Sequence, residues 1–326
     1  MKLFYIGSGP ISNFHIPALK SVGFNITGIA TRLNSKRCEE FSLKHGLREV
    51  YEKGGWEEGL KNNNFDCIVL AVDTKYTPDI LNKIMHYEIP ILVEKPVGWH
   101  PIQLEKLIES NPSGAQKVMV AYNRRYYKIV NLLKDYIDNN DQGLITISIP
   151  DSISSIRQFL VNGCHMVDLL CYLMPELTLN YCKCNLKSDG NISSIVGLGE
   201  YKSNWQILIN SVPEAPDNFE IKVSSGPNVY RLRPIEVLEV YEGMEIVQPS
   251  EEMPLRRYLP KLSERIIENT TFKPGFYSQA NDFYNFCKLD KKSKSFCSLE
   301  DAYKTLQICY QLLSSNKLNY EDSIKL

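Results

Sequence analysis

The stretch KLFYIGSGPIS, residues 2–12, decides how the first part of this chain folds. Its first five residues predict a short buried strand, and a helical pattern follows from Asn13 to Val22. Between them, Gly7 permits a tight turn and Gly9 lets backbone N–H groups approach a pyrophosphate, which the helix N-terminus also favours. Strand, glycine turn and helix in this order predict a dinucleotide-binding site. The third glycine of the G-x-G-x-x-G pattern is replaced by Ser12.

Strands and helices alternate over the rest of the first third. The continuous apolar run at residues 66–72 is typical of a strand covered on both faces. Alternation of this kind predicts an α/β fold with a doubly wound parallel sheet. We expect strands at 26–30, 66–72, 91–93 and 117–121, with helices at 35–45 and 79–87.

The residues after the second strand bear on cofactor preference. Sites that prefer NAD place an acidic residue about twenty positions after the glycines, where it holds the ribose 2′-hydroxyl. This chain has Thr31 and Arg32 there, and the nearest acid downstream is Glu39. The pattern favours NADP, with Thr31, Arg32 and either Ser35 or Lys36 as candidates to hold the 2′-phosphate. The alternative is an exposed arginine that stacks on the adenine of either cofactor.

The strand at 91–93 ends abruptly in Glu94-Lys95-Pro96. Because this strand belongs to the parallel series, its carboxyl end lies at the same sheet edge as the glycine turn, where such sheets bind ligands. We therefore expect Lys95 to be a catalytic group and Glu94 to fix the loop. The alternative is an ordinary strand end with solvated charges.

Composition excludes several classes of protein. The 326 residues suffice for two domains, and 37 basic against 38 acidic residues give a net charge of −1. Binders of nucleic acid or membrane surfaces usually carry excess basic charge, so neither partner is expected. The N-terminal apolar run is too short for a signal peptide, and no stretch approaches membrane-spanning length. We expect a soluble cytoplasmic protein.

The nine cysteines indicate neither a disulfide framework nor a metal site. They are scattered along the chain, and the odd number suits a reducing compartment. The one close pair, Cys182 and Cys184, has no second pair or histidine nearby to complete four zinc ligands. No metal is predicted.

Four motifs in order resemble the Gfo/Idh/MocA oxidoreductases. The first is the glycine turn, with His15 in the following helix, and the second is Glu94-Lys95-Pro96. The others are YNRRY, at residues 122–126, and NGCHMVDLL, at residues 162–170. The helix expected at 298–313 is also similar to the family's closing helix, so the resemblance covers nearly the whole chain.

The resemblance implies a Rossmann domain followed by an α/β domain on a large, mostly antiparallel sheet, whose open face often mediates oligomerisation. A homo-oligomer, dimer or tetramer, is therefore expected. It also implies NAD(P)-dependent transfer of a hydride to or from a hydroxyl or keto carbon of a sugar, cyclitol or nucleotide sugar. By the family's pattern Lys95 lies near the nicotinamide and His165 is the acid/base, which suits a histidine near neutral pH.

One departure from the family pattern leaves two other functions open. Many members have an aspartate four residues before the histidine, but this chain has Val161 there, followed by Asn162. The Asn-Gly-x-His variant resembles the branch linked to polysaccharide and nucleotide-sugar biosynthesis. The alternatives are a non-catalytic dinucleotide-binding regulator and a lyase or dehydratase that recycles its bound nicotinamide.

The candidate site residues fall into three groups. The catalytic candidates are Lys95 and His165. Cofactor contacts are expected from Gly7, Ser8, Gly9, Pro10, Ile11, Thr31, Arg32, Ala71, Val72, Asp73, Tyr76, Glu94, Lys95 and Asn123. Substrate contacts are expected from Tyr122, Arg124, Arg157, Asn162 and Asp168, and Arg125 is a further candidate because guanidinium groups bind phosphate and carboxylate.

The remainder of the chain is expected to form the second domain. We place the division at 1–121 and 122–326, with an amphipathic helix at 126–137 and β-like segments separated by turn residues. These segments are 178–186, 194–201, 204–212, 219–224, 229–234 and 236–241. Residues 253–261 contain two prolines and suggest an excursion over the site or a neighbouring subunit. The helix starting near Gly275 carries Phe276 and Tyr277, for which packing in the core is expected.

Overall fold

The computed structural model describes residues 1–31, 38–47, 50–51, 55–62, 64–151, 154–268 and 271–313. They form two compact units. The first contains the described residues of 1–126 together with 271–307, and the second contains those of 127–268 with 308–313. The division at 121/122 stays a prediction about folding domains. The units differ from it because the chain returns to the first unit after the second sheet.

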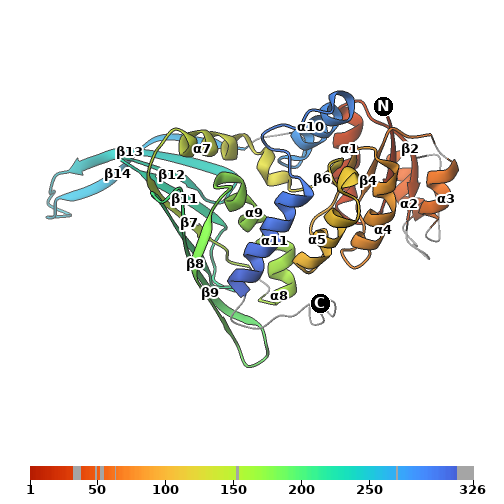
Figure 1. Ribbon diagram of the computed structural model, residues 1–326. Coiled ribbons are helices and arrows are strands. Elements are labelled where there is room, and N and C mark those ends of the chain that lie inside the picture. The colour runs from red at the N-terminus through yellow and green to blue at the C-terminus, as the bar shows by residue number, and fades with distance from the viewer. Residues whose placement is uncertain are drawn as a thin grey trace. The chain divides into compact units, whose positions relative to one another are not determined.

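The first unit is built on a six-stranded parallel sheet in the order β3-β2-β1-β4-β5-β6 (Figure 1). The strand order changes direction at β1, since β2 and β3 lie on one side of it and β4 to β6 on the other. This is the order of a doubly wound dinucleotide-binding sheet. The strands are β1 (Lys2–Ile6), β2 (Asn25–Ala30), β3 (Val50–Tyr51), β4 (Cys67–Leu70), β5 (Ile91–Val93) and β6 (Val118–Val120). The expected Rossmann fold is confirmed.

Helices join these strands and cover the sheet. The first is α1 (Ser12–Ser21), which begins directly after the glycine turn. The others are α2 (Cys38–His45), α3 (Trp56–Asn62), α4 (Thr77–Ile84), α5 (Pro101–Ser110) and α6 (Pro112–Ala115). Short 3₁₀ turns lie at η1 (Met85–Tyr87) and η2 (Asn123–Tyr126). The strand residues are buried throughout β1, β4 and β5 apart from Lys2, as their continuous apolar sequence predicts.

The returning segment completes the core of the first unit. It carries α10 (Phe276–Leu289) and most of α11 (Leu299–Leu313). Helix α10 packs against α1, where Phe283 is fully buried with its ring centroid 5.6 Å from that of Phe24. Aromatic side chains contribute most to such a core because each removes a large apolar area from water.

The second unit is built on an eight-stranded sheet in the order β14-β13-β12-β11-β7-β10-β9-β8. Only β7 and β10 run parallel, and every other neighbouring pair is antiparallel. The strands are β7 (Gly143–Ser148), β8 (Thr178–Leu186), β9 (Ile192–Tyr201), β10 (Trp205–Ser211), β11 (Glu220–Ser225), β12 (Asn228–Leu232), β13 (Val237–Val247) and β14 (Arg257–Ile267). The large, mostly antiparallel sheet is confirmed.

Helices lie on one face of this sheet (Figure 1). They are α7 (Lys128–Asp138), the short α8 (Ile156–Gln158), the π-helix η3 (Phe159–Gly163) and α9 (Cys164–Leu173). Helix α9 is almost wholly buried because its sequence is apolar on all sides. The last turn of α11 also packs on the sheet, where a Cβ on Gly197 would lie 2.7 Å from Leu312.

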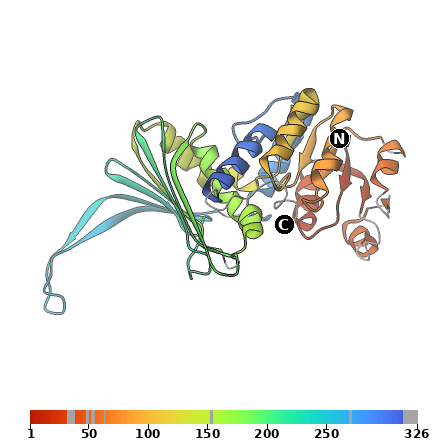
Figure 2. The ribbon, with the colours of Figure 1, turned by 60° about the horizontal axis from the view of Figure 1, so that its bottom comes forward.

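The later part of the excursion expected at 253–261 is strand, and its covering of the site or of a neighbouring subunit stays a prediction. Residues 257–267 form β14, an edge strand paired with β13 in a long hairpin that projects beyond the other strands of the second sheet (Figure 2). Proline is tolerated on an edge strand because its missing N–H faces away from the ladder. Pro260 lies opposite Met244, next to an irregularity in the register. The prolines of this segment argued against a strand in the sequence, but an edge strand tolerates Pro260.

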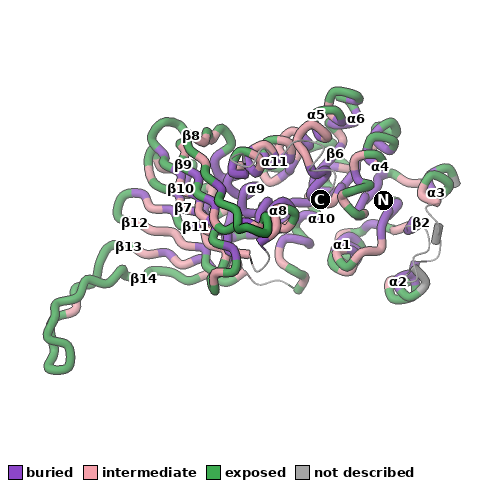
Figure 3. Tube along the Cα trace, turned by 90° about the horizontal axis from the view of Figure 1, so that it is seen from below, coloured by how far each residue is buried: buried purple, intermediate pink, exposed green. Residues whose placement is uncertain are grey.

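The face of the second sheet opposite α9 carries exposed apolar side chains. Leu198 and Tyr181 are opposite each other on β9 and β8 and are 44% and 49% exposed. The projecting part of β13 and β14 is exposed almost throughout (Figure 3). Exposed apolar patches of this extent mark interaction surfaces more often than chance. In the part of the chain that the structure describes, no helix has the length and hydropathy needed to cross a membrane.

Replacing Phe283 with alanine tests whether α10 is part of the first unit's core. Its fully buried ring contacts Phe24, so Phe283→Ala should lower the free energy of unfolding by about 3–5 kcal/mol. Leu289, 62% exposed on the same helix, provides the control, and Leu289→Ala should change stability by less than about 0.5 kcal/mol. Urea unfolding followed by circular dichroism measures both. Equal effects would show that α10 is not packed as described.

Candidate active site

The two glycines of the turn differ in the space around them, because a side chain has no room at Gly7 but has room at Gly9. Gly7 has φ of 130°, and a Cβ there would lie 2.0 Å from the backbone oxygen of Ala71. Its N–H donates to the Ala30 oxygen at 2.8 Å, so the ends of β1, β2 and β4 meet at this residue. A Cβ on Gly9, by contrast, would meet no atom within 4 Å. The backbone after β1 is therefore accessible to a ligand.

Thr31 provides a second sign of a missing ligand at this edge. It follows β2 and is 4% exposed, yet its hydroxyl has no hydrogen-bond partner among the described residues. A buried hydroxyl without a partner is costly, and a ribose or phosphate oxygen would satisfy it. Arg32, the residue on which the NADP expectation rests, lies outside the described residues. The open turn and Thr31 together fit a bound dinucleotide.

The loop after β4 lies at the same edge. Ala71 is buried and donates its N–H to the Ile6 oxygen at 2.7 Å. Val72, the next residue, is partly exposed to solvent. Asp73 is exposed and accepts a hydrogen bond from the Lys75 N–H at 3.0 Å. Tyr76 is 53% exposed at the start of α4. The sheet thus brings the loops after β1 and β4 together with Thr31 at the end of β2, as the strand series predicts.

Glu94 holds the loop that carries Lys95 through a contact with His15. The Oε1 atom of Glu94 lies 2.5 Å from Nε2 of His15, and the two side chains are 11% and 3% exposed. The other carboxylate oxygen accepts the Lys95 N–H at 3.2 Å, and the Glu94 N–H donates to the Leu70 oxygen at 2.8 Å. Glu94 therefore ties the end of β5 to α1. The expectation that Glu94 fixes the loop agrees with these contacts.

The far side of the loop is fixed as well. The peptide bond between Lys95 and Pro96 is cis. The side-chain oxygen of Gln103 accepts the N–H groups of Trp99 and His100 at 2.8 and 3.0 Å. The backbone that carries Lys95 is thus held on both sides, which restricts where its ammonium can lie.

The residues after β6 divide into candidates and structural groups. Tyr122 and Asn123 are buried, and the Asn123 amide donates to the Pro274 oxygen at 3.0 Å. Arg124 is partly exposed at this edge. Arg125 is 3% exposed, donates to the Phe296 oxygen at 3.3 Å and lies 3.5 Å from Asp301. Arg125 therefore holds α11 and is corrected from a substrate candidate to a structural residue.

The remaining candidates lie in the second unit. Asn162, on η3, donates its amide to Asp151 at 3.0 Å, and π-helices are frequent at functional sites. His165 and Asp168 follow on α9 and are 8% and 0% exposed. Arg157 is exposed on α8. Lys95 belongs to the first unit and His165 to the second, so their action on a common substrate stays a prediction.

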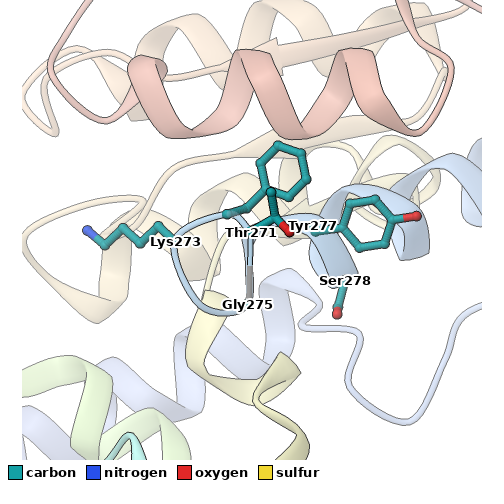
Figure 4. Close-up of a pocket in the computed structure, with 6 residues that line it drawn as sticks. Thr271, Lys273, Gly275, Tyr277 and Ser278 are labelled. Atoms are coloured by element: carbon teal, nitrogen blue, oxygen red, sulfur yellow. The ribbon is translucent and has the colours of Figure 1, made fainter. Parts of the chain in front are cut away.

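The returning segment contributes features that sequence reasoning missed (Figure 4). A cavity of about 200 Å³ in the first unit is lined by Thr271, Phe272, Lys273, Gly275, Tyr277 and Ser278. Phe276 is 3% exposed and packs on His15 with ring centroids 4.8 Å apart, as core packing predicts. Tyr277 is 45% exposed and stacks on Phe272, so its expected place in the core is wrong. An aromatic pair at adjacent helical positions cannot bury both rings in one direction, and this signal was available in the sequence.

Comparison with known proteins agrees with this geometry. Residues 1–122 match the Gfo/Idh/MocA model, described as an oxidoreductase family with an NAD-binding Rossmann fold. Myo-inositol 2-dehydrogenase of Thermotoga maritima is 22% identical over 187 residues, which are 54% of this chain and 55% of that protein. The chain therefore matches about half the length of this curated relative.

Two solved structures show the same overall fold. A dehydrogenase named MviM from Clostridium difficile has a TM-score of 0.76 at 19% identity, covering 97% of this chain and 99% of its own. The UDP-N-acetylglucosamine 3-dehydrogenase GnnA from Acidithiobacillus ferrooxidans has a TM-score of 0.72 at 12% identity, covering 96% of each chain. At these identities the likeness establishes the fold.

The two glycines of the turn make a matched pair of variants. Gly9→Ala places a methyl group in open space, so stability should not change while dinucleotide affinity falls about tenfold or more, or about 1.4 kcal/mol. Gly7→Ala meets the Ala71 oxygen and should instead lower the melting temperature. Titration with NADH, followed by nicotinamide fluorescence, and thermal unfolding measure the two effects. Unchanged NADH affinity in Gly9→Ala would exclude the turn as the binding site.

Proposed function

We propose that this chain, which belongs through its first 122 residues to the Gfo/Idh/MocA family of oxidoreductases with an NAD-binding Rossmann fold, is an NAD(P)-dependent sugar or nucleotide-sugar dehydrogenase. It transfers a hydride to or from a hydroxyl or keto carbon. The observation that carries this proposal is the open glycine turn at the same strand edge as the fixed Lys95 loop. Hydride transfer at an alcohol carbon requires a nicotinamide cofactor and a positioned group that stabilises charge on the alcohol oxygen. The glycine turn and the Lys95 ammonium are suited to these two roles.

The chain's own residues supply binding and proton transfer. The backbone at Ser8, Gly9 and Pro10 and the hydroxyl of Thr31 hold the cofactor, whose nicotinamide supplies the hydride chemistry. Lys95 holds the substrate oxygen, where its positive charge stabilises developing alkoxide character. His165 accepts the hydroxyl proton in oxidation and returns it in reduction. Tyr122, Arg124, Arg157, Asn162 and Asp168 remain proposed substrate contacts.

The cofactor preference and substrate class rest on different features. Arg32 after β2, with no acid at the ribose position, supports NADP over NAD. The named functions of the similar proteins, which act on myo-inositol and on UDP-N-acetylglucosamine, support a cyclic polyol or a nucleotide sugar. The Asn-Gly-x-His sequence at 162–165 supports the nucleotide sugar.

One observation supports a second candidate function. Val161 stands where many members of the family that this chain resembles have an aspartate. Without that acid the chain lacks one acid/base group, as expected of a regulator that binds a dinucleotide without turnover. The two functions differ in a single measurement, because a regulator binds the cofactor but reduces none in the presence of any sugar.

A screen for cofactor reduction tests the leading proposal. NAD and NADP are supplied in parallel against cyclic polyols, sugars and nucleotide sugars, with turnover followed at 340 nm. With the substrate found, His165→Ala should lower kcat about 10²- to 10⁴-fold while the Kd for NADH stays within twofold of the wild-type value. Lys95→Met should also lower kcat. Wild-type turnover by His165→Ala would remove His165 from the mechanism.

We also propose that the chain forms a homo-oligomer through the open face of the second sheet. The exposed Leu198 and Tyr181 there support it, because burying such a face against a second copy removes apolar area from water. Cytoplasmic location stays a proposal on the sequence features alone.

A charge on the open face should separate the subunits. Leu198→Lys should shift the mass measured by light scattering to that of one chain, since a lysine there must lose its hydration in the interface. Leu289, 62% exposed in the first unit, gives the matched control, and Leu289→Lys should leave the mass unchanged. A wild-type protein of single-chain mass at working concentration would contradict the oligomer proposal.

A further inference from the structure

The segment that returns to the first unit bears a cation with no acidic partner. The ammonium of Lys273 lies 4.4 Å from the ring centroid of Phe14 and 5.6 Å from that of Phe276. In the described chain no carboxylate lies within ion-pair distance of it, and the nearby Glu94 is held by His15. Lys273 is exposed as a whole, and the two rings cover only one side of its ammonium.

The charges around Lys273 are mainly positive. Desolvation is the largest cause that lowers the pKa of Lys273, and the charge of Arg124 lowers it further. Glu94 opposes this effect, and Lys95 adds the smallest lowering. Like charges held together destabilise one another, and a bound anion relieves this repulsion. A bound anion beside the Lys273 ammonium would offset the unfavourable effect of these two cations.

The N-terminus of α10 adjoins this cation. The helix has 14 residues and begins after Gly275, whose φ is 81°, and no side chain caps this end. The first N–H groups of a helix lack intrahelical acceptors, and the helix dipole favours an anion there. Thr271 and Ser278 line the same cavity, where Figure 4 shows Lys273 and Tyr277 pointing in opposite directions.

Gln279 gives an independent indication that the first turn of α10 is missing a ligand. It is 1% exposed, and neither its amide nitrogen nor its amide oxygen has a hydrogen-bond partner in the described part of the chain. Leaving both ends of a buried amide unsatisfied costs about 1–3 kcal/mol per group. A polar ligand or an ordered water that it recruits would remove this cost.

We propose that Lys273 and the first turn of α10 form a subsite for a phosphate group of the bound ligand. The inference deepens the proposed function and rests on it. Phosphate suits the site because its oxygens accept bonds from an ammonium, from hydroxyls and from helix N–H groups at once. The phosphate belongs either to the diphosphate of a nucleotide-sugar substrate or to the cofactor.

A lysine in the same unit provides a matched control. Lys292 also lies over two phenyl rings, 5.1 Å from the centroid of Phe296 and 6.0 Å from that of Phe286, but it belongs to neither the cavity nor the strand edge. Comparing Lys273→Ala with Lys292→Ala removes the effect of losing a lysine stacked on phenyl rings. Thermal unfolding of both variants checks that each is folded.

Calorimetric titration of the full chain with UDP, NADH and NADPH tests the subsite. Lys273→Ala should weaken at least one of these ligands about tenfold or more, while Lys292→Ala leaves all three within twofold. Loss for UDP alone assigns the phosphate to the substrate. Loss for both cofactors assigns it to the pyrophosphate, and loss for NADPH alone to the 2′-phosphate. Lys273→Ala affinities within twofold of wild type for every ligand, or equal losses in Lys292→Ala, would overturn the proposal.

Two further results separate this subsite from the proposed function. UDP binding that depends on Lys273, in a wild-type protein that binds neither cofactor, would refute the dehydrogenase and keep the subsite. The affected ligand should also bind more weakly as pH rises through the lowered pKa of Lys273, because the ammonium then loses its charge. Lys273→Arg should restore affinity and remove this pH dependence, since arginine stays protonated.

Discussion

The arrangement of this strand edge depends on the pairing of Glu94 with His15. It joins α1, which follows the glycine turn, to the end of β5, and both side chains are almost fully buried. Because the carboxylate is committed to His15 and to the Lys95 N–H, it is less available to neutralise the lysines nearby. One contact thus positions the loop that carries Lys95 against the helix that follows the glycine turn.

Periodicity was sufficient for most of the fold. The apolar runs at 66–72 and 91–93 correspond to β4 and β5, and the segment 178–186 corresponds to β8. These elements follow from local sequence because a strand buried on both faces must be continuously apolar, and a half-buried strand must alternate. The positions of Gly7 and Lys95 at one edge followed as well, because parallel strands place their carboxyl ends together.

The rest depends on contacts that local sequence does not encode. Strand β14 contains Pro260 and fits the sheet because it lies at the edge, a place that its own sequence does not reveal. Helix α10 has an apolar face, but nothing in that pattern says it packs on α1, more than 250 residues earlier. The role of Glu94 became clear only from its contact with His15 in the folded chain. The surroundings of Lys273 became clear only from its contacts with Phe14 and Phe276. These are tertiary pairings between distant segments.

The charge distribution narrows the substrate class within the proposed function. A neutral polyol such as inositol needs hydrogen-bonding groups around its hydroxyls, and acidic side chains serve that role well. This chain has Val161 at a position where the family that it resembles often has an aspartate, and the ammonium of Lys273 has no carboxylate within ion-pair distance in the described part of the chain. Each feature taken separately favours an anionic substrate, since the first removes an acidic group and the second supplies a cation. A nucleotide sugar, which combines a reactive hydroxyl with a diphosphate, therefore fits this edge better than a free cyclic polyol.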